Sequence, residues 1–118
     1  MKIYGTGIDI VEVDRVRRLL GKNNRFRDRV FTKAEIRYCE GKKKKYEHYA
    51  VRFAAKESVW KALGKGGIGL KSIEVKNETG GKPQIVIKHS LLDKKQEIVI
   101  TLIHTKKYAI AHALVLGA

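Results

Sequence analysis

The sequence predicts an α+β fold: a single domain, residues 1–118, in which an N-terminal strand and several helices precede a mainly antiparallel sheet. Helical spacing of apolar residues dominates the first half of the chain after one early strand, and short β-type runs dominate the second half. Helices followed by strands are typical of α+β domains. A chain of 118 residues has room for one hydrophobic core but not for two.

The N-terminal segment is expected to form one strand and then short helical pieces. Residues 3–13 are rich in Ile, Val and Gly, which predicts a strand. A short helix should follow over about 13–20. Residues 25–29 should form either a turn of helix or a loop.

The middle of the chain carries the start and stop signals of two helices. Thr32 followed by Glu35 is a capping-box pattern, which predicts a helix that runs to about residue 40. After a lysine-rich interruption, a longer helix is predicted over 46–63 and should end at the glycines that follow. Its apolar side is expected to consist of Tyr49, Phe53, Trp60 and Leu63.

The second half of the chain changes to β-type patterns separated by turn residues. The segment Thr79-Gly80-Gly81 predicts a turn between two strands. Residues 90–93 predict a short helical turn. The four expected strands are 73–76, 84–88, 97–103 and 108–116.

Charge is the first indication of function. The chain has 26 Lys and Arg residues against 12 Asp and Glu residues, a formal net charge of +14. Thirteen of the basic residues, but only three of the acidic ones, lie between residues 15 and 45. Such a field attracts a polyanion, which could be a nucleic acid, an acidic protein or a phosphate-rich small molecule. A solvated basic surface without a partner is the alternative.

The remaining composition favours a cytoplasmic protein with no membrane segment. No apolar run approaches the roughly 18 residues that a membrane span needs. The segment after Met1 lacks the apolar stretch of a secretory signal. Cys39 is the only cysteine, so an internal disulfide is impossible and a reducing compartment is expected.

Asp9 is the first candidate functional residue. It lies between Ile8 and Ile10 in a glycine-rich apolar segment, where a charge is costly unless it has a partner. Capping of the helix that follows, or simple exposure to solvent, would also explain it. On the residues alone these structural explanations are favoured.

Glu57 is the second candidate, at the edge of the apolar side of the long helix. An i,i+4 ion pair with Lys61 is its ordinary explanation. If Asp9 and Glu57 converge, however, two carboxylates with several waters would suit an octahedral Mg²⁺ ion. Such an ion typically links protein carboxylates to phosphates.

Two glycine-rich segments and one histidine are weaker candidates. Gly5-Thr6-Gly7 and residues 64–69 could bring backbone amides close to a phosphate. Neither matches a nucleotide-binding motif, and ordinary turn chemistry explains both equally well. His104, next to basic residues at an expected hairpin tip, could bind an anion or carry a proton. No serine or cysteine motif supplies a nucleophile, which could therefore belong to the substrate.

Four motifs occur in order along the chain: Gly7-Ile8-Asp9-Ile10 with Glu12 and Arg15, Arg52-Phe53-Ala54-Ala55-Lys56-Glu57 continuing to Lys61-Ala62, Gly80-Gly81-Lys82-Pro83, and His104-Thr105-Lys106-Lys107-Tyr108-Ala109. Together they resemble the holo-acyl-carrier-protein synthase family of 4′-phosphopantetheinyl transferases. The resemblance covers essentially the whole chain. It implies an enzyme that transfers 4′-phosphopantetheine from coenzyme A to a serine of apo acyl carrier protein, releases adenosine 3′,5′-bisphosphate and supports fatty acid biosynthesis.

The resemblance also implies roles for individual residues. Asp9 and Glu57 would hold Mg²⁺ on the pyrophosphate of coenzyme A, and Lys61 would reach the phosphates as a point charge. Glu57, directly or through a metal-bound water, would accept the serine proton. The other implied coenzyme A contacts are Arg52, Gly64, Lys82, Pro83, His104 and Thr105.

Three positions depart from the family pattern. Ile103 is apolar where a hydroxyl residue is usual, so a water or phosphate contact is not expected there. Ser58 and Trp60 stand where smaller or apolar residues are frequent. None of these changes affects the implied metal ligands.

The implied partners are an acidic acyl carrier protein and two further copies of the chain. Basic residues would steer the carrier and apolar ones would contact it, at Arg15, Leu19, Lys22, Arg25 and Phe26. A homotrimer with active sites at subunit interfaces is implied. Within the last strand, residues 109–116 are apolar on both alternating faces except at His112, as expected for a strand covered on both sides. Burial under the chain's own helices is the alternative.

Two other functions are compatible with the charge. A small nucleic-acid-binding module would leave Asp9 and Glu57 unexplained, and aromatic residues interleave poorly with the basic ones. Nucleic acid is therefore not expected as a partner. A non-catalytic scaffold that binds an acidic protein is the second alternative.

Overall fold

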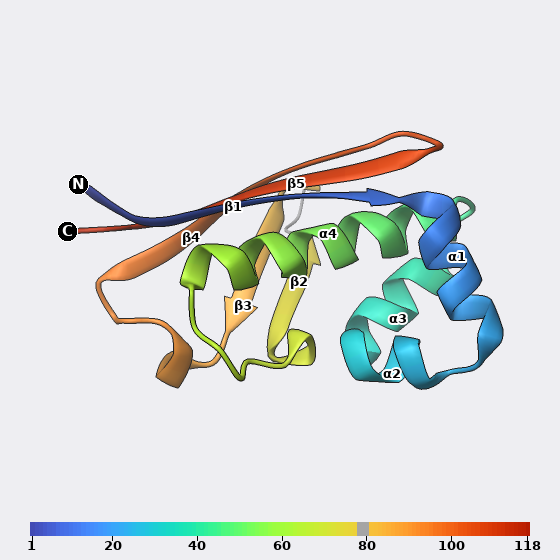
Figure 1. The fold of residues 1–118 in the computed structure, drawn as a ribbon, viewed down its shortest axis with the longest axis horizontal. Coiled ribbons are helices and arrows are strands. Elements are labelled where there is room, and N and C mark those ends of the chain that lie inside the picture. The colour runs from blue at the N-terminus through green and yellow to red at the C-terminus, as the bar shows by residue number, and fades with distance from the viewer. Residues whose placement is uncertain (78–80) are drawn as a thin grey trace.

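The computed structural model describes residues 1–77 and 81–118, apart from the side chain of His89, and confirms the α+β prediction (Figure 1). Two 3₁₀ turns, Leu70–Ser72 and His89–Leu91, accompany the main elements. In chain order these are β1 (Lys2–Glu12), α1 (Val13–Lys22), α2 (Arg25–Val30), α3 (Lys33–Glu40), α4 (Lys45–Leu63), β2 (Ile73–Asn77), β3 (Pro83–Ile87), β4 (Gln96–His104) and β5 (Tyr108–Gly117).

The predicted boundaries agree with these elements to within a few residues. Residues 25–29 are helical, and the second 3₁₀ turn overlaps the expected turn at 90–93. The predicted turn at Thr79-Gly80-Gly81 lies largely outside the described residues. Within the described ranges, no helix is both long and apolar enough to cross a membrane.

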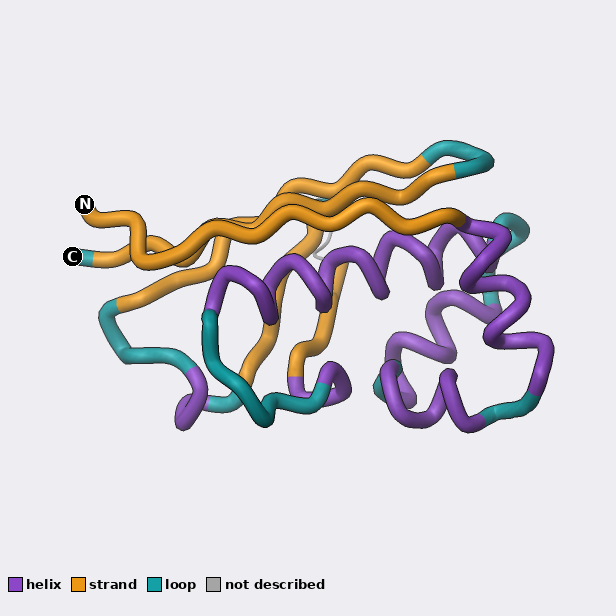
Figure 2. Tube along the Cα trace, in the orientation of Figure 1, coloured by secondary structure: helices purple, strands orange, loops and turns teal. Residues whose placement is uncertain are grey.

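A three-stranded antiparallel sheet, with β5 between β1 and β4, forms one layer of the fold (Figure 2). Helix α4 runs along one face of this sheet (Figures 1 and 2). The register places Gly7 opposite Ala113 and Asp9 opposite Ala111. The β5 residues on the α4 side are small and buried, so the helix can pack close to the sheet: Ala109, Ala111, Ala113 and Val115.

A second, two-stranded antiparallel sheet consists of β2 and β3. β2 contacts α4 and β3 contacts β4, so this small sheet lies beside the edge of the larger one. The arrangement brings α4, β3 and β4 together around a pocket that is described below.

A buried ion pair joins the helical corner, formed by α1 to α3, to α4. Glu35 completes the predicted capping box with Thr32 and also accepts a hydrogen bond from the backbone N–H of Val75 at 2.8 Å. Its carboxylate pairs with Lys56, and both side chains are fully buried. Burial lowers the pKa of Lys56, and the charge of Glu35 opposes that shift. Because an unpaired buried charge costs about 3–5 kcal/mol, this pair constrains the orientation of α4.

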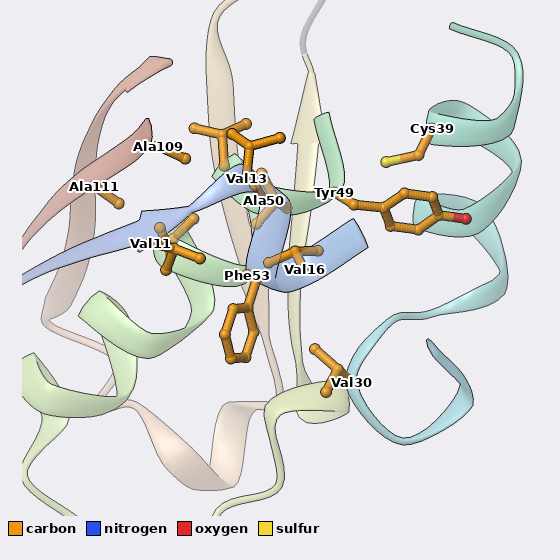
Figure 3. Packing of buried hydrophobic residues seen from close by; sticks show 14 of the residues in the cluster. Val11, Val13, Val16, Val30, Cys39, Tyr49, Ala50, Phe53, Ala109 and Ala111 are labelled. Atoms are coloured by element: carbon orange, nitrogen blue, oxygen red, sulfur yellow. The ribbon is translucent and has the colours of Figure 1, made fainter. Parts of the chain in front are cut away.

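The core surrounds α4 on most of its sides, which corrects the prediction of a single apolar side. Tyr49 and Phe53 are buried as predicted, among residues of β1, β5 and the helical corner (Figure 3). Trp60, however, is 38% exposed, and Leu63 is only half-buried. The helix has several packing partners, so small residues such as Ala54 are buried where a one-sided helix would be polar.

Candidate active site

β1 approaches α4 so closely that only glycine fits at two positions. A Cβ atom on Gly5 would collide with the backbone oxygen of Ala62, and one on Gly7 with the backbone oxygen of Ser58. The segment Gly5-Thr6-Gly7 is therefore extended strand, and its glycines serve close packing rather than a phosphate-binding turn. Because side chains alternate along a strand, Asp9 lies on the same face and meets the same helix.

Asp9 is paired with a lysine of α4. The Nζ atom of Lys61 lies 3.1 Å from Oδ1 of Asp9 and also donates to the backbone oxygen of Ile8 at 3.1 Å. The Asp9 side chain is only 18% exposed. It does not cap the following helix, because α1 begins at Val13 with Glu12 at its N-cap. The lysine offsets the cost of a charge in this apolar segment.

Glu57 lies one helical turn before Lys61 and is half-buried. Its pKa is raised from the ordinary value, first by burial and second by the negative charge of Asp9. The positive charges of Lys61 and Arg15 act in the opposite direction. The charge of Asp9 thus acts on Glu57, while the ion pair of Lys61 is formed with Asp9 instead of Glu57.

This pair of carboxylates fits a hard divalent cation. Asp9 raises the proton affinity of Glu57, and a shared cation would relieve the same repulsion. Across residues 1–77 and 81–118 there is no group of three or more His, Cys, Asp or Glu side chains that could hold a metal. A cation held by Asp9 and Glu57 would take its other positions from water or ligand. Mg²⁺ is usually bound in this way.

A second group of predicted residues surrounds a pocket of about 350 Å³. Arg52, Pro83 and His104 all line it. Arg52 is 3% exposed, donates from Nη2 to Oδ1 of Asn77 at 2.6 Å and stacks over the ring of Tyr38 at 4.0 Å. Among the described side chains, its Nε is the one buried nitrogen or oxygen without a hydrogen-bond partner. A buried cation with a free N–H donor suits an anionic ligand.

His104 reaches this pocket from the end of β4. Its Nδ1 lies 2.9 Å from Oε1 of Glu47, and its ring centroid lies 5.4 Å from that of His48. Burial and then the charge of Arg52 lower the pKa of His48, which keeps that ring neutral at pH 7. The hydroxyl of Thr105 accepts hydrogen bonds from backbone N–H groups of the β4–β5 turn, so Thr105 stabilises the turn.

The other residues predicted to contact coenzyme A lie near one of two groups: the carboxylates with Lys61, or the pocket with Arg52. Gly64 ends α4 in a left-handed conformation with φ 65°, one turn beyond Lys61. Lys82 is exposed and adjoins Pro83 of the pocket. Arg52 faces β2 through Asn77, whereas Lys61, on the same helix, faces β1. The structure thus places the predicted site residues at two positions, on different sides of α4.

Comparison with known proteins identifies the family. The model of the 4′-phosphopantetheinyl transferase superfamily matches residues 5–113. The chain belongs to this superfamily. The transferase is 40% identical over 118 residues to a holo-acyl-carrier-protein synthase of Thermoanaerobacter sp. (strain X514), covering 94% of this chain and 86% of that one. It is 53% identical over 87 residues to a synthase of the same name from Geobacter sp. (strain M21), covering 70% of each chain.

A solved structure agrees with this assignment over nearly the full length of the transferase. The crystal structure of a holo-acyl-carrier-protein synthase from Bacillus anthracis str. Ames, in complex with CoA (3′,5′-ADP), superposes with a TM-score of 0.85. The two sequences are 32% identical, and the match covers 98% of each chain. The shared fold therefore includes β1, α4 and the β4–β5 hairpin, which carry most of the predicted site residues of this transferase.

Sequence reasoning missed four residues of the transferase's pocket region: Tyr38, Glu47, His48 and Asn77. Each contacts Arg52 or His104 from an element distant in sequence. Their sequence neighbours carry no motif. Only the tertiary arrangement of α3, α4 and β2 reveals them.

The five residues predicted to bind the carrier lie on α1 and at the start of α2. Arg15, Lys22 and Arg25 are exposed, and Leu19 is half-buried. Phe26 is also half-buried and makes edge-to-face contacts with Phe31 and Phe53, at centroid distances of 6.0 and 5.3 Å. Phe26 therefore belongs partly to the core of the transferase.

Proposed function

We propose that the transferase is a Mg²⁺-dependent holo-acyl-carrier-protein synthase. It moves 4′-phosphopantetheine from coenzyme A to a serine of apo acyl carrier protein, and adenosine 3′,5′-bisphosphate leaves. Membership of the superfamily and the named relatives support the reaction. The observation that carries the Mg²⁺ dependence is the convergence of Asp9, Glu57 and Lys61 from two elements of the fold.

Asp9 and Glu57 are the residues that would hold the ion, whose charge would neutralise the pyrophosphate of coenzyme A. Lys61 has an exposed, flexible stem and can turn from Asp9 toward a phosphate as a point charge. Glu57 is our first choice of base because its raised pKa strengthens its affinity for a proton. The serine Oγ attacks the β-phosphorus, the bond from that phosphorus to the bridging oxygen breaks, and the serine proton passes to Glu57 or to an adjacent water.

The pocket that contains Arg52, Pro83 and His104 would bind the nucleotide end of coenzyme A. The buried Arg52, with its free Nε donor, supports an anion there, and the ring of Pro83 offers an apolar contact. Lys82, next to Pro83, would add charge, and Gly64, one turn beyond Lys61, would leave room for the phosphate chain. Thr105 would contribute mainly through the turn that presents His104.

A homotrimer with active sites at subunit interfaces would unite the two groups of residues. The outer face of the three-stranded sheet carries exposed apolar side chains: Ile8, Ile10 and Ile103 are 64%, 62% and 59% exposed. Ile8 and Ile10 also wall the shallow pocket that contains Asp9 and Lys61. A neighbouring subunit that covered this face would therefore complete the same pocket. Closed cyclic symmetry repeats one such contact per subunit.

The basic face of α1 is the proposed docking surface for the carrier. Arg15, Leu19 and Lys22 share one side of this helix at i, i+4 and i+7. Arg25 and Phe26 continue that surface into α2. Exposed cations would steer an acidic carrier, while Leu19 and the exposed part of Phe26 would provide apolar contact. We expect the reaction to take place in the cytoplasm.

The proposal is tested by incubating the transferase with Mg²⁺, coenzyme A and apo acyl carrier protein, followed by mass spectrometry of the carrier. We expect the carrier to gain the mass of one 4′-phosphopantetheine group. Removal of Mg²⁺ with EDTA should stop the gain, and added Mg²⁺ should restore it. Full transfer in EDTA would exclude the metal, and an unchanged carrier under all conditions would exclude the function.

A further inference from the structure

Glu47 and His104 form a hydrogen-bonded pair at the margin of the nucleotide pocket. Oε1 of Glu47 lies 2.9 Å from Nδ1 of His104. Glu47 lies in the first turn of α4, and His104 is the last residue of β4. The Glu47 side chain is only 13% exposed, against 35% for His104. The contact therefore fixes an accessible imidazole against a mostly buried carboxylate.

The pairing determines which ring nitrogen is left for a ligand. A carboxylate oxygen only accepts hydrogen bonds, so Nδ1 of His104 must carry the hydrogen. Nε2 is then the nitrogen available to the pocket. It accepts a hydrogen bond when the ring is neutral and donates one when the ring is protonated. A histidine partner commonly sets the tautomer and orientation of the ring in this way.

Other contacts already limit the movement of His104. The ring lies beside that of His48, with 5.4 Å between centroids and 56° between planes. The backbone after it is held by the turn, in which the N–H groups of Lys107 and Tyr108 donate to Oγ1 of Thr105 at 3.2 and 3.0 Å. The turn holds the backbone and His48 lies beside the His104 ring. The hydrogen bond to Glu47 therefore fixes the rotation that the imidazole could still make.

Glu47 acts on the pocket without facing it. His104 lines the nucleotide pocket, but Glu47 lines a neighbouring groove, among Lys43, Lys44, Lys45 and Lys106. A carboxylate that faced an anionic ligand would repel it. On the far side of the imidazole, the same carboxylate instead orients a group that does face the ligand.

We propose that Glu47 is a positioning residue, which holds the His104 ring so that Nε2–H donates a hydrogen bond to a phosphate of the bound coenzyme A. This inference rests on the proposed function, because it takes the pocket as the nucleotide site. Substitution of Glu47 should affect coenzyme A binding rather than the chemical step. The reason is that Glu47 and His104 belong to the pocket group, which lies on a different side of α4 from Asp9 and Glu57.

The test is a double-mutant cycle on the full-length transferase with Glu47→Ala, His104→Ala and their combination. We expect Glu47→Ala to raise the KM for coenzyme A about fivefold to tenfold with little change in kcat, the size expected for one lost hydrogen bond. The combination should be no worse than His104→Ala alone. Glu47→Gln, which keeps an accepting oxygen, should restore most of the affinity.

A spectroscopic readout separates this inference from the proposed function. In ¹⁵N NMR of the ligand-free protein, His104 should show protonated Nδ1 in the wild type and a mixture of tautomers in Glu47→Ala. An unchanged tautomer in Glu47→Ala, or fully additive effects in the double mutant, would overturn the role of Glu47. If His104→Ala leaves the coenzyme A KM unchanged while the tautomer still depends on Glu47, the nucleotide assignment of the pocket fails, and the proposed phosphate contact fails with it.

Discussion

Lys61 on α4 is paired with Asp9 on β1, with 3.1 Å between Nζ and Oδ1. The pair connects two motifs that are more than fifty residues apart in the sequence, and Glu57 lies one turn away on the same helix. An ammonium group thus occupies the position next to Asp9 where a metal ion is proposed. If Asp9 holds Mg²⁺ in the loaded enzyme, Lys61 would have to release this carboxylate, and its ammonium group would then be free for a phosphate.

Removal of either proposed metal ligand should abolish transfer. We expect Asp9→Ala and Glu57→Ala to lower kcat/KM by several orders of magnitude while the protein stays folded, because a lost ligand forfeits several kcal/mol of transition-state stabilisation. Transfer is measured by mass spectrometry of the carrier, and Mg²⁺ binding by calorimetry. Glu12→Gln, at an exposed carboxylate of β1 whose side chain makes no capping bond, is the matched control. Near-normal turnover in either ligand variant would rule out the metal assignment.

Glu57 should also reduce stability at neutral pH. Its folded-state pKa is raised by burial and by Asp9, so ionisation costs more in the folded protein than in the unfolded chain. This cost is absent below the unfolded pKa, grows as pH rises toward the folded pKa, and is complete above it. Glu57→Gln is therefore expected to raise Tm at pH 7 but to leave it unchanged well below pH 4.5, the ordinary value for this carboxyl.

Thermal unfolding over this pH range in EDTA provides the measurement. Glu12→Gln is again the control, because it makes the same substitution at an exposed carboxylate of β1. A Glu57→Gln variant that is less stable than the wild type at pH 7 would contradict the prediction.

The two glycines of β1 yield a prediction that links packing to activity. Gly7→Ala would place a methyl group against the backbone oxygen of Ser58, and neither backbone can move without disturbing the core. We expect a loss of about 1–3 kcal/mol of unfolding free energy, typical of overpacking, and a loss of transfer because Asp9 follows on the same strand. Gly66→Ala, where a methyl group meets nothing within 4 Å, is the matched control and should be nearly neutral. Equal stability of the two variants would show that the close approach is dispensable.

Most of the secondary structure was accessible from the sequence because its signals are local. The capping box of Thr32 and Glu35 and the glycine after Leu63 mark helix ends within a few residues. The packing around α4 was not accessible, since Trp60 fits an apolar side by spacing but is left exposed by the tertiary arrangement. A helical wheel cannot reveal that several layers pack on one helix.

The candidate site also contains residues that the sequence could reveal and residues that it could not. Asp9 was anomalous by sequence because a charge in an apolar strand requires a partner, and Lys61 is that partner. The hydrogen bond between Glu47 and His104 was invisible, because Glu47 is ordinary in its local context and no local pattern links it to His104. Pairing between a helix and a distant strand depends on register, which no local pattern encodes.

Charge reversal on the docking surface should separate the two substrates. We expect Lys22→Glu and Arg25→Glu to raise the KM for the carrier with little effect on the KM for coenzyme A, because these side chains are exposed on α1 and α2. The defect should shrink at high salt, which screens the attraction in the wild type. The charge of Arg15 lowers the pKa of Glu57, so Arg15→Glu should raise that pKa further. A larger share of Glu57 would then already carry a proton at a given pH and could not accept the serine proton, which should also lower kcat.

Steady-state kinetics with each substrate varied in turn provide the measurement. Lys94→Glu makes the same charge change on the loop before β4, away from α1, and should leave both KM values unchanged (Figure 1). Equal increases in both KM values for Lys22→Glu and Arg25→Glu would assign these cations to the nucleotide site.

The final prediction concerns assembly and follows from the separation of the two residue groups on α4. If each active site combines Asp9 and Glu57 of one subunit with the Arg52 pocket of a neighbour, two inactive chains should rescue each other. A trimer should have a mass of about 40 kDa by light scattering, three times the 13.4 kDa of one chain. Glu57→Ala chains retain an intact pocket, and Arg52→Met chains retain intact carboxylates. In trimers refolded from equal amounts of both, about one site in four should pair the two intact halves, by random assembly around a closed ring.

If each site lay within one chain, every site would carry one defect and mixing would restore nothing. Mixed trimers are verified by native mass spectrometry, and trimers refolded from each variant alone are the controls. A fully active monomer, or verified mixed trimers without recovered transfer, would refute the shared site.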